Sequence, residues 1–180
     1  MILKFNILKL KFKLLLLRTI GTTNRNIPTL ELNQQGHNSK DILIIFPHDE
    51  EAFRVAVYTF EDLLKKDENS SYYFIINTLN QNMHSFHKNT IIVDFDKNIG
   101  NQINARNKRH ILNGSFDIIV DLNTAFNYNC SKFVNIISSK LKIGFKSRFS
   151  DLFYNIQLDA SSTNIIENLY KKIYSMVLPI

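Results

Sequence analysis

The sequence predicts a single α/β domain, a Rossmann-like three-layer fold built on a mostly parallel β-sheet. Short, continuous apolar runs such as 42–46 and 118–120 are typical of strands that are covered on both faces. These runs alternate with segments whose apolar residues recur at helical spacing, a pattern that indicates right-handed βαβ crossovers. We therefore expect 42–46 and 118–120 to be neighbouring central strands that run in the same direction.

The first strand is expected at 41–47 and is followed by a helix. Asp49 is a candidate N-cap for this helix, and Glu50 and Glu51 would lie in its first turn, where acidic side chains favour the helix dipole. Apolar residues at helical spacing extend the helix to about residue 65.

The remaining elements continue the alternation. Apolar stripes place one helix around Cys130 to Leu141 and the last helix around Ile165 to Met176. Gly114 is expected to end a short polar helix. In chain order, the further strands are expected at 72–77, 91–95, 116–122, 142–145 and 153–158, and the further helices at 100–112, 130–141 and 162–177.

Length and charge divide the chain into an arm and one domain. The 180 residues, 44% of them hydrophobic, are enough for one domain with a real core. Residues 1–40 carry seven basic side chains and one acidic side chain, whereas residues 41–180 have no net charge. We therefore predict a basic N-terminal arm and linker over 1–40 and a Rossmann-like domain over 41–180. Nucleic-acid binding is not expected, because its basic patch usually lies on the folded module.

The arm leaves two interpretations open. Charges interrupt the apolar residues of 1–20, so no run is long enough for a transmembrane helix. No signal-peptide cleavage site follows the short apolar run at 14–17. The arm is either a packed helix or edge strand with snorkelling lysines, or a peripheral membrane contact. The single cysteine, Cys130, fits a reducing compartment. The expected location is the cytoplasm, with peripheral contact to the inner face of the membrane as an option.

Motifs for cofactors and metals are missing from the sequence. It contains neither a phosphate loop nor a G-x-G-x-x-G motif, and neither H-E-x-x-H nor G-x-S-x-G. We therefore predict no cofactor. His84 and His87 lack a third ligand, so no metal site is predicted. Cys130 lies on an apolar stripe and is expected to be a buried small hydrophobe rather than a nucleophile.

Polar residues at two strand ends are the candidate site, because open α/β sheets bind ligands beyond the carboxyl ends of their strands. After the first strand, Asp49 could act as a general base, and His48 and Glu50 could bind the ligand. Helix capping explains the acids of this turn equally well. Asp121 and Asn123 end a later strand, FDIIVDLN, on the same side of the sheet, and could bind polar ligand groups or serve as loop and capping residues.

Three segments together resemble the lipopolysaccharide heptosyltransferases, glycosyltransferase family nine. They are DILIIFPHDEEAFRVAVYTFEDLL at 41–64, FDIIVDLN at 116–123 and KLKIGFKSR at 140–148. The order and spacing of these segments resemble the family's strand, acidic turn and helix, and its later strand, helix and strand. The resemblance covers about 41–160. The family has glycine before the acid of the turn, whereas this chain has His48.

The resemblance implies the N-terminal, acceptor-side half of a GT-B glycosyltransferase, with Asp49 at the position of the family's base. The sequence ends where the donor-binding domain would start, so we expect a stand-alone or truncated domain that is not active alone. Its implied partners are a sugar or glycolipid acceptor and a separate donor-domain chain. The alternative interpretation is a non-catalytic α/β binding or scaffold protein, which leaves enzymatic activity undecided.

Overall fold

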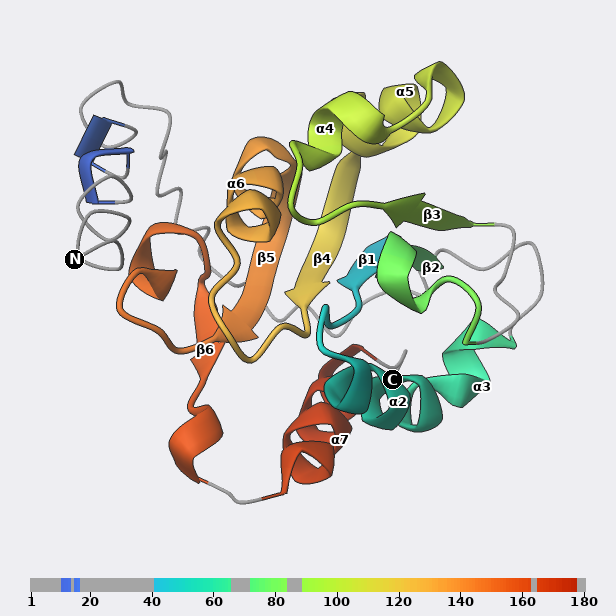
Figure 1. Cartoon of the computed structure of the whole chain (residues 1–180), viewed down its shortest axis with the longest axis vertical. Helices are drawn as coiled ribbons and strands as arrows, with labels where there is room; N and C mark the ends of the chain where they lie inside the picture. The colour runs from blue at the N-terminus through green and yellow to red at the C-terminus, as the bar shows by residue number, and fades with distance from the viewer. Residues whose placement is uncertain are drawn as a thin grey trace, which may run out of the picture.

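A six-stranded, all-parallel β-sheet forms the centre of the domain (Figure 1). The computed structural model describes residues 11–13, 15–16, 41–65, 72–83, 89–162 and 165–177. The strand order is β3-β2-β1-β4-β5-β6, and every neighbouring pair is parallel. The predicted neighbours β1 and β4 are confirmed, with Ile42 opposite Ile118. The strands are β1 (Ile42–Ile45), β2 (Tyr72–Asn77), β3 (Thr90–Val93), β4 (Ser115–Asp121), β5 (Ser138–Phe145) and β6 (Ile156–Leu158).

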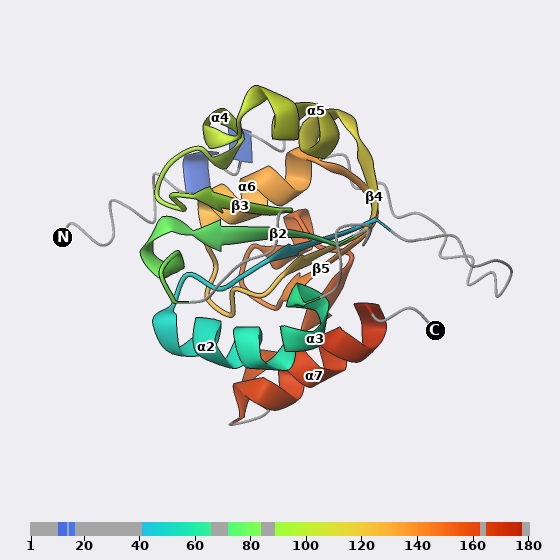
Figure 2. The ribbon, with the colours of Figure 1, turned by 90° about the vertical axis from the view of Figure 1, so that its right-hand side faces the viewer.

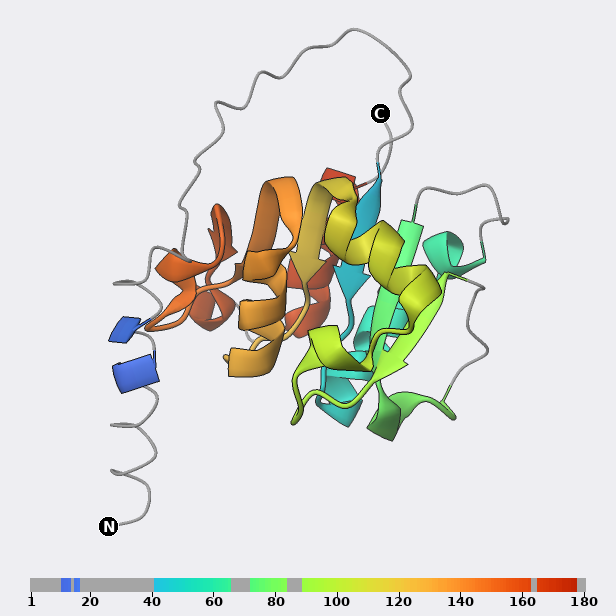
Figure 3. The same cartoon turned by 90° about the horizontal axis from the view of Figure 1, so that it is seen from above.

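Helices cover both faces of this sheet and complete the predicted three layers. Figure 2 shows α2, α3 and α7 on one face and α4, α5 and α6 on the other. Viewed over the second face, α6 lies on the β5 side of the sheet and α5 on the β1 and β2 side (Figure 3). The helices are α2 (Glu50–Thr59), α3 (Glu61–Leu64), α4 (Ile99–Gln102), α5 (Ala105–Asn113), α6 (Tyr128–Ile136) and α7 (Ile166–Val177).

Alternation along β1 divides the core between the two faces. Ile42 and Ile44 pack with α2 and α7, whereas Leu43 and Ile45 pack beneath the helices of the opposite face. All four side chains are buried, which explains why the strand reads as an uninterrupted apolar run.

The structure corrects the end of the helix predicted around 130–141. This helix, α6, ends at Ile136, and Ile137 is already extended. Ser138 then begins β5, so Leu141 lies on a strand and pairs with Ile118 of β4. The prediction was wrong because Ile137 and Leu141 are spaced by four residues, as on a helix, although sheet pairing determines their conformation.

Other boundaries also differ from the predictions. The helix expected to end near residue 65 breaks at Phe60 into α2 and α3, and the one at 100–112 breaks at Ile103 into α4 and α5. The last strand is shorter than predicted, since Phe153 caps the 3₁₀ turn at 150–152 and β6 begins only at Ile156. The ends of the predicted last stripe are exposed: Ile165 lies just before α7 and Met176 near its end.

The arm is described only in part. Residues 11–13 and 15–16 are helical, and the Lys13 ammonium lies 5.5 Å from the ring centre of Tyr128 on α6. Phe12 and Leu15 of this segment are exposed. In the part of the chain that the structure describes, no helix combines the length and apolar character needed to cross a membrane.

Candidate active site at the carboxyl edge of the sheet

The turn after β1 carries the predicted acids at the carboxyl edge of the sheet. The Asp49 side chain is exposed, and its Oδ1 accepts a hydrogen bond of 2.9 Å from the backbone amide of Ala52. Asp49 is therefore the N-cap of α2, as predicted. Glu50 instead pairs with Arg54 at 2.5 Å along the exposed face of the helix, an arrangement that contributes little to stability.

Asparagine side chains from both neighbouring strands hold this turn in place. From the β4 side, Asn123 Oδ1 accepts a 2.8 Å hydrogen bond from the amide of His48. From the β2 side, Asn80 Nδ2 donates to the carbonyls of Pro47 and His48, at 3.2 and 3.3 Å. The turn that leads to Asp49 is thus held by two side chains, which come from the segments that follow β2 and β4, the strands on either side of β1.

The His48 ring is fixed in one orientation and one neutral tautomer. Asn77 Oδ1 accepts from the amide of Leu79 and the hydroxyl of Thr78, at 3.0 and 3.3 Å, which assigns the nitrogen of the Asn77 amide. That nitrogen lies 2.6 Å from His48 Nδ1, and because it can only donate, Nδ1 must accept. The neutral imidazole therefore carries its hydrogen on Nε2. The ring stacks on Phe95, with centroids 6.3 Å apart.

Asp121 is buried beneath the edge and does not open to solvent. Its Oδ2 accepts from the Tyr154 hydroxyl at 2.6 Å, and its Oδ1 accepts from the amide and side chain of Asn123 at 3.0 and 2.7 Å. Burial raises the pKa of this carboxyl, although the hydrogen bonds from Tyr154 and Asn123 oppose the shift. Burial also raises the Tyr154 pKa well above its usual value, and the Asp121 charge adds to this effect.

The five predicted residues thus have different surroundings. His48, Asp49 and Asn123 come together at the edge, Asp121 supports Asn123 from below, and Glu50 turns toward Arg54. Sequence reasoning missed the amides that follow β2 and the tyrosine that precedes β6. The amides had a usable signal, since they follow an apolar strand as Asn123 does. Tyr154 had none, because it lies 33 residues from the carboxylate that it contacts.

Asp94, just beyond β3, was also missed and adds negative charge to this edge. It pairs with Lys97 at 2.9 Å, and this hydrogen bond is the main reason that its pKa is lowered, with a smaller contribution from His48. The sequence signal was again its position immediately after an apolar strand.

The described residues of this edge include neither a cluster of metal-binding side chains nor a reactive thiol. No cluster of three metal-binding side chains occurs among the described residues, and the predicted pair His84 and His87 falls outside them. Cys130 is buried, and burial raises the pKa of its thiol well above the usual value. This agrees with the predicted packing role, because the thiolate is the reactive form.

Structural comparison shows the fold of this chain in a known enzyme. A solved structure of E. coli heptosyltransferase WaaC with ADP superposes with a TM-score of 0.50 at 11% sequence identity. The match covers 76% of this chain and 46% of the WaaC chain, so this chain spans about half the length of that enzyme. No family model and no curated protein sequence matches the chain. The likeness establishes an α/β domain of the type that forms one half of a GT-B enzyme.

Proposed function

We propose that this chain is the acceptor-binding domain of a heptosyltransferase-like GT-B glycosyltransferase, and that it does not transfer sugar without a donor-binding domain. The proposal is supported by the likeness to one half of a heptosyltransferase, together with the polar groups at the carboxyl edge of the sheet. The acceptor in this proposal is a sugar or glycolipid of the cell envelope. The nucleotide sugar would be bound by a donor-binding domain.

The arrangement of Asp49 carries this proposal. Oδ1 caps α2, whereas Oδ2 has no hydrogen-bond partner among the described residues, and the side chain is exposed. Capping and catalysis therefore use different oxygens of one carboxylate. Oδ2 would take the proton of an acceptor hydroxyl while that oxygen bonds to the anomeric carbon and the bond to the nucleotide diphosphate breaks.

Two neighbours would position the acceptor beside Asp49. The Nε2–H of His48 is a hydrogen-bond donor in the tautomer set by Asn77, so His48 would bind a sugar oxygen rather than remove a proton. Asn123 and, through it, the buried Asp121 would act as positioning residues, because they hold the amide of His48. The predicted ligand role of Glu50 has less support, since Arg54 occupies its carboxylate.

An NMR titration of the full chain with deacylated lipopolysaccharide core oligosaccharide tests this proposal. We expect shifts at 46–51, 77–80 and 121–123. Asp49→Asn should bind about tenfold more weakly, because a hydrogen bond to a charged group is lost, whereas asparagine keeps the helix cap. Glu51→Gln removes a neighbouring exposed charge and should leave affinity unchanged. Absence of binding, or equal affinity in wild type and Asp49→Asn, would instead favour the non-catalytic scaffold interpretation.

Membrane contact through residues 1–20 is a second, separate proposal. It is supported by the exposed apolar side chains of Phe12 and Leu15 beside basic residues. Full-length chain should sediment with vesicles that contain anionic lipid and less with neutral vesicles. Equal sedimentation after Phe12→Ser and Leu15→Ser would contradict it.

A further inference from the structure

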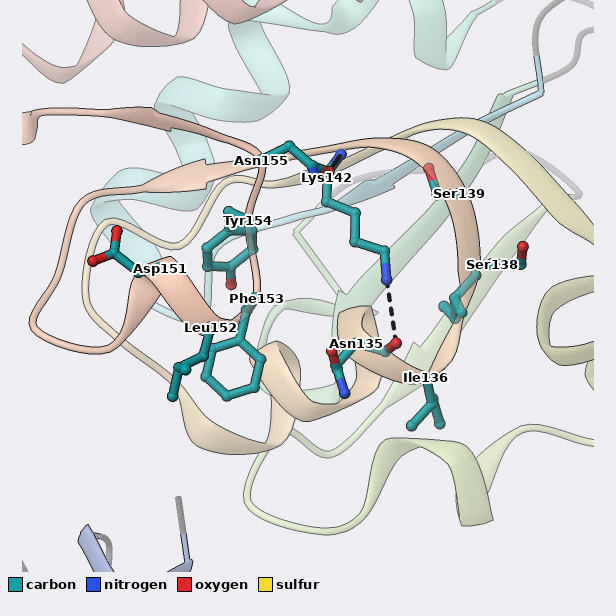
Figure 4. A pocket seen from close by; sticks show the side chains of 11 residues that line it. Asn135, Ile136, Ser138, Ser139, Lys142, Asp151, Leu152, Phe153, Tyr154 and Asn155 are labelled. Carbon is teal, nitrogen blue, oxygen red and sulfur yellow. Dashed lines mark hydrogen bonds between the residues drawn. The ribbon is translucent and has the colours of Figure 1, made fainter. Parts of the chain in front are cut away.

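A pocket lies away from the candidate active site, toward the amino-terminal ends of β5 and β6. It has a volume of about 230 Å³, is open to solvent on one side, and is lined by the end of α6, the start of β5 and the segment before β6. Figure 4 shows the Lys142 side chain reaching across it toward Asn135, with Phe153 on one side and Ser138 on the other. The volume is below the roughly 300–1,000 Å³ of pockets for drug-sized ligands, so an occupant must be small.

Lys142 is the one basic side chain of this pocket and has no acidic partner among the described residues. Its Nζ donates to the carbonyl of Asn135 at 3.2 Å, and an ammonium has two further donors. Lys140, two residues earlier on the same strand, differs in both respects: it is exposed and pairs with Asp117 at 2.6 Å. The two lysines are therefore a matched pair: an acidic side chain balances the charge of Lys140 at the surface, whereas none in the described part of the chain balances the charge of Lys142 in the pocket.

The other titratable groups of the pocket do not balance this charge. Asp151 accepts a 2.8 Å hydrogen bond from Gln157 and is exposed, and the Tyr154 hydroxyl points away to Asp121. Burial lowers the pKa of Lys142 to about 8, and no carboxylate counteracts the shift. An anion bound here would supply the missing charge and would raise that pKa again.

We infer that this pocket binds a small monocarboxylate with an apolar body, whose carboxylate is held by the Lys142 ammonium and whose body lies against Phe153 and Ile136. A single cation matches a single negative charge. The end of α6 presents the Asn135 carbonyl rather than amide donors, which disfavours a phosphate dianion. The ring of Phe153 and the half-exposed side chain of Ile136 provide the apolar surface.

Benzoate is the probe, and the observed signals are the lysine ε-carbons of full-length chain labelled with ¹³C-lysine. Without ligand, one lysine should titrate near pH 8, which is the value for Lys142. Benzoate should raise that midpoint. Above the midpoint of the ligand-free protein, the affinity for benzoate should fall by about tenfold for each pH unit, because only the ammonium binds. Benzamide, which has the same shape without the charge, should bind at least about tenfold more weakly, since it makes no charge-assisted hydrogen bond.

Two substitutions on one strand complete the test. Lys142→Met keeps an unbranched side chain, shorter by the ammonium group, and should weaken benzoate binding more than about tenfold, whereas Lys140→Met should leave it unchanged. Equal binding to Lys142→Met, a Lys142 midpoint unmoved by saturating benzoate, or tighter binding of inorganic phosphate would each overturn the inference. If Lys142→Met fails to fold, the titration of wild-type Lys142 still decides. In an amide spectrum of ¹⁵N-labelled chain, benzoate should not move the signals of 46–51, so this outcome is independent of acceptor binding at the other edge.

Discussion

Replacing Tyr154 with phenylalanine probes the polar network beneath the candidate active site. The substitution removes one hydroxyl and leaves the ring in place. That hydroxyl donates to Asp121 Oδ2 at 2.6 Å and lies 3.0 Å from Ser131 Oγ, and all three side chains are buried. In the variant, Oδ2 of a buried carboxylate loses its hydrogen-bond donor.

The magnitude follows from the charge of the acceptor. A hydrogen bond to a charged group contributes about 1.5–3 kcal/mol, and leaving the charged partner buried without a donor puts the loss within this range. We expect the free energy of unfolding to fall by about 2 kcal/mol near neutral pH. For a domain of this size that corresponds to a melting temperature lower by roughly 4–8 °C.

The pH dependence distinguishes this explanation from simple loss of packing. Burial raises the folded-state pKa of Asp121, so the folded protein binds more protons than the unfolded chain between the two pKa values, and stability falls as the pH rises through that window. Tyr154 opposes this shift by stabilising the ionised carboxylate. The cost of Tyr154→Phe should therefore be largest where Asp121 is ionised and should shrink as acid protonates it.

Urea unfolding followed by circular dichroism, at neutral and acidic pH, measures this cost. Tyr170→Phe is the matched control, because its buried hydroxyl donates at 2.9 Å to the uncharged carbonyl of Leu122. The control should cost about 1 kcal/mol at either pH. If Tyr154→Phe costs no more than Tyr170→Phe, or costs the same at both pH values, the hydroxyl does not stabilise an ionised Asp121.

Three further substitutions test other contacts. Gly144→Ala would place a Cβ 2.6 Å from the ring of Tyr154 and should lower the free energy of unfolding in urea by more than about 2 kcal/mol. Gly100→Ala is the control, because its Cβ would meet no atom closer than 3.5 Å and should not destabilise the fold. Equal effects of the two substitutions would contradict the close packing at Gly144. Lys142→Met removes an ammonium whose pKa falls from 10.5 to about 8 on folding. The substitution should stabilise the fold by about 1 kcal/mol near neutral pH, after allowance for partial exposure, and this gain should disappear as the pH rises from about 8 to 10.5. No gain at neutral pH would show that the ammonium is well solvated. Asn123→Ala should weaken oligosaccharide binding about as much as Asp49→Asn, since it releases the His48 amide; unchanged binding would exclude a positioning role.

The central strands β1, β2 and β4 could be predicted from sequence because each contains a continuous apolar run, as expected of a strand that is buried on both faces. The start of β5 could not, since Ser138, Ser139 and Lys140 carry no apolar signal and are paired with β4 only through the sheet. The helix breaks at Phe60 and Ile103 were missed for a related reason. Both residues are apolar and fit a helical stripe, whereas their backbone conformations depend on tertiary packing.

The residues of the candidate site could be predicted from sequence where they directly follow a recognisable strand. His48, Asp49 and Asn123 follow obvious strands, and parallel pairing of β1 with β4 brings their ends together. Which carboxylate is accessible was not predictable. Asp49 follows the apolar run of β1 and Asp121 ends that of β4, but Asp121 is an internal residue whose partners include the distant Tyr154. Lys142 gave no signal at all, because a lysine on a strand is ordinarily exposed.

The residue before Asp49 explains how this turn is held without a glycine. A glycine there would have no side chain, and only backbone bonds could hold the turn. His48 instead uses its side chain as well as its backbone: Asn77 binds its ring, and its amide and carbonyl are bound by Asn123 and Asn80. Three amide side chains, at the end of β2 and in the segments after β2 and β4, thus fix the turn from both sides. Such a fixed turn supports the proposed role of Asp49, because a general base must lie within hydrogen-bond reach of the proton it removes.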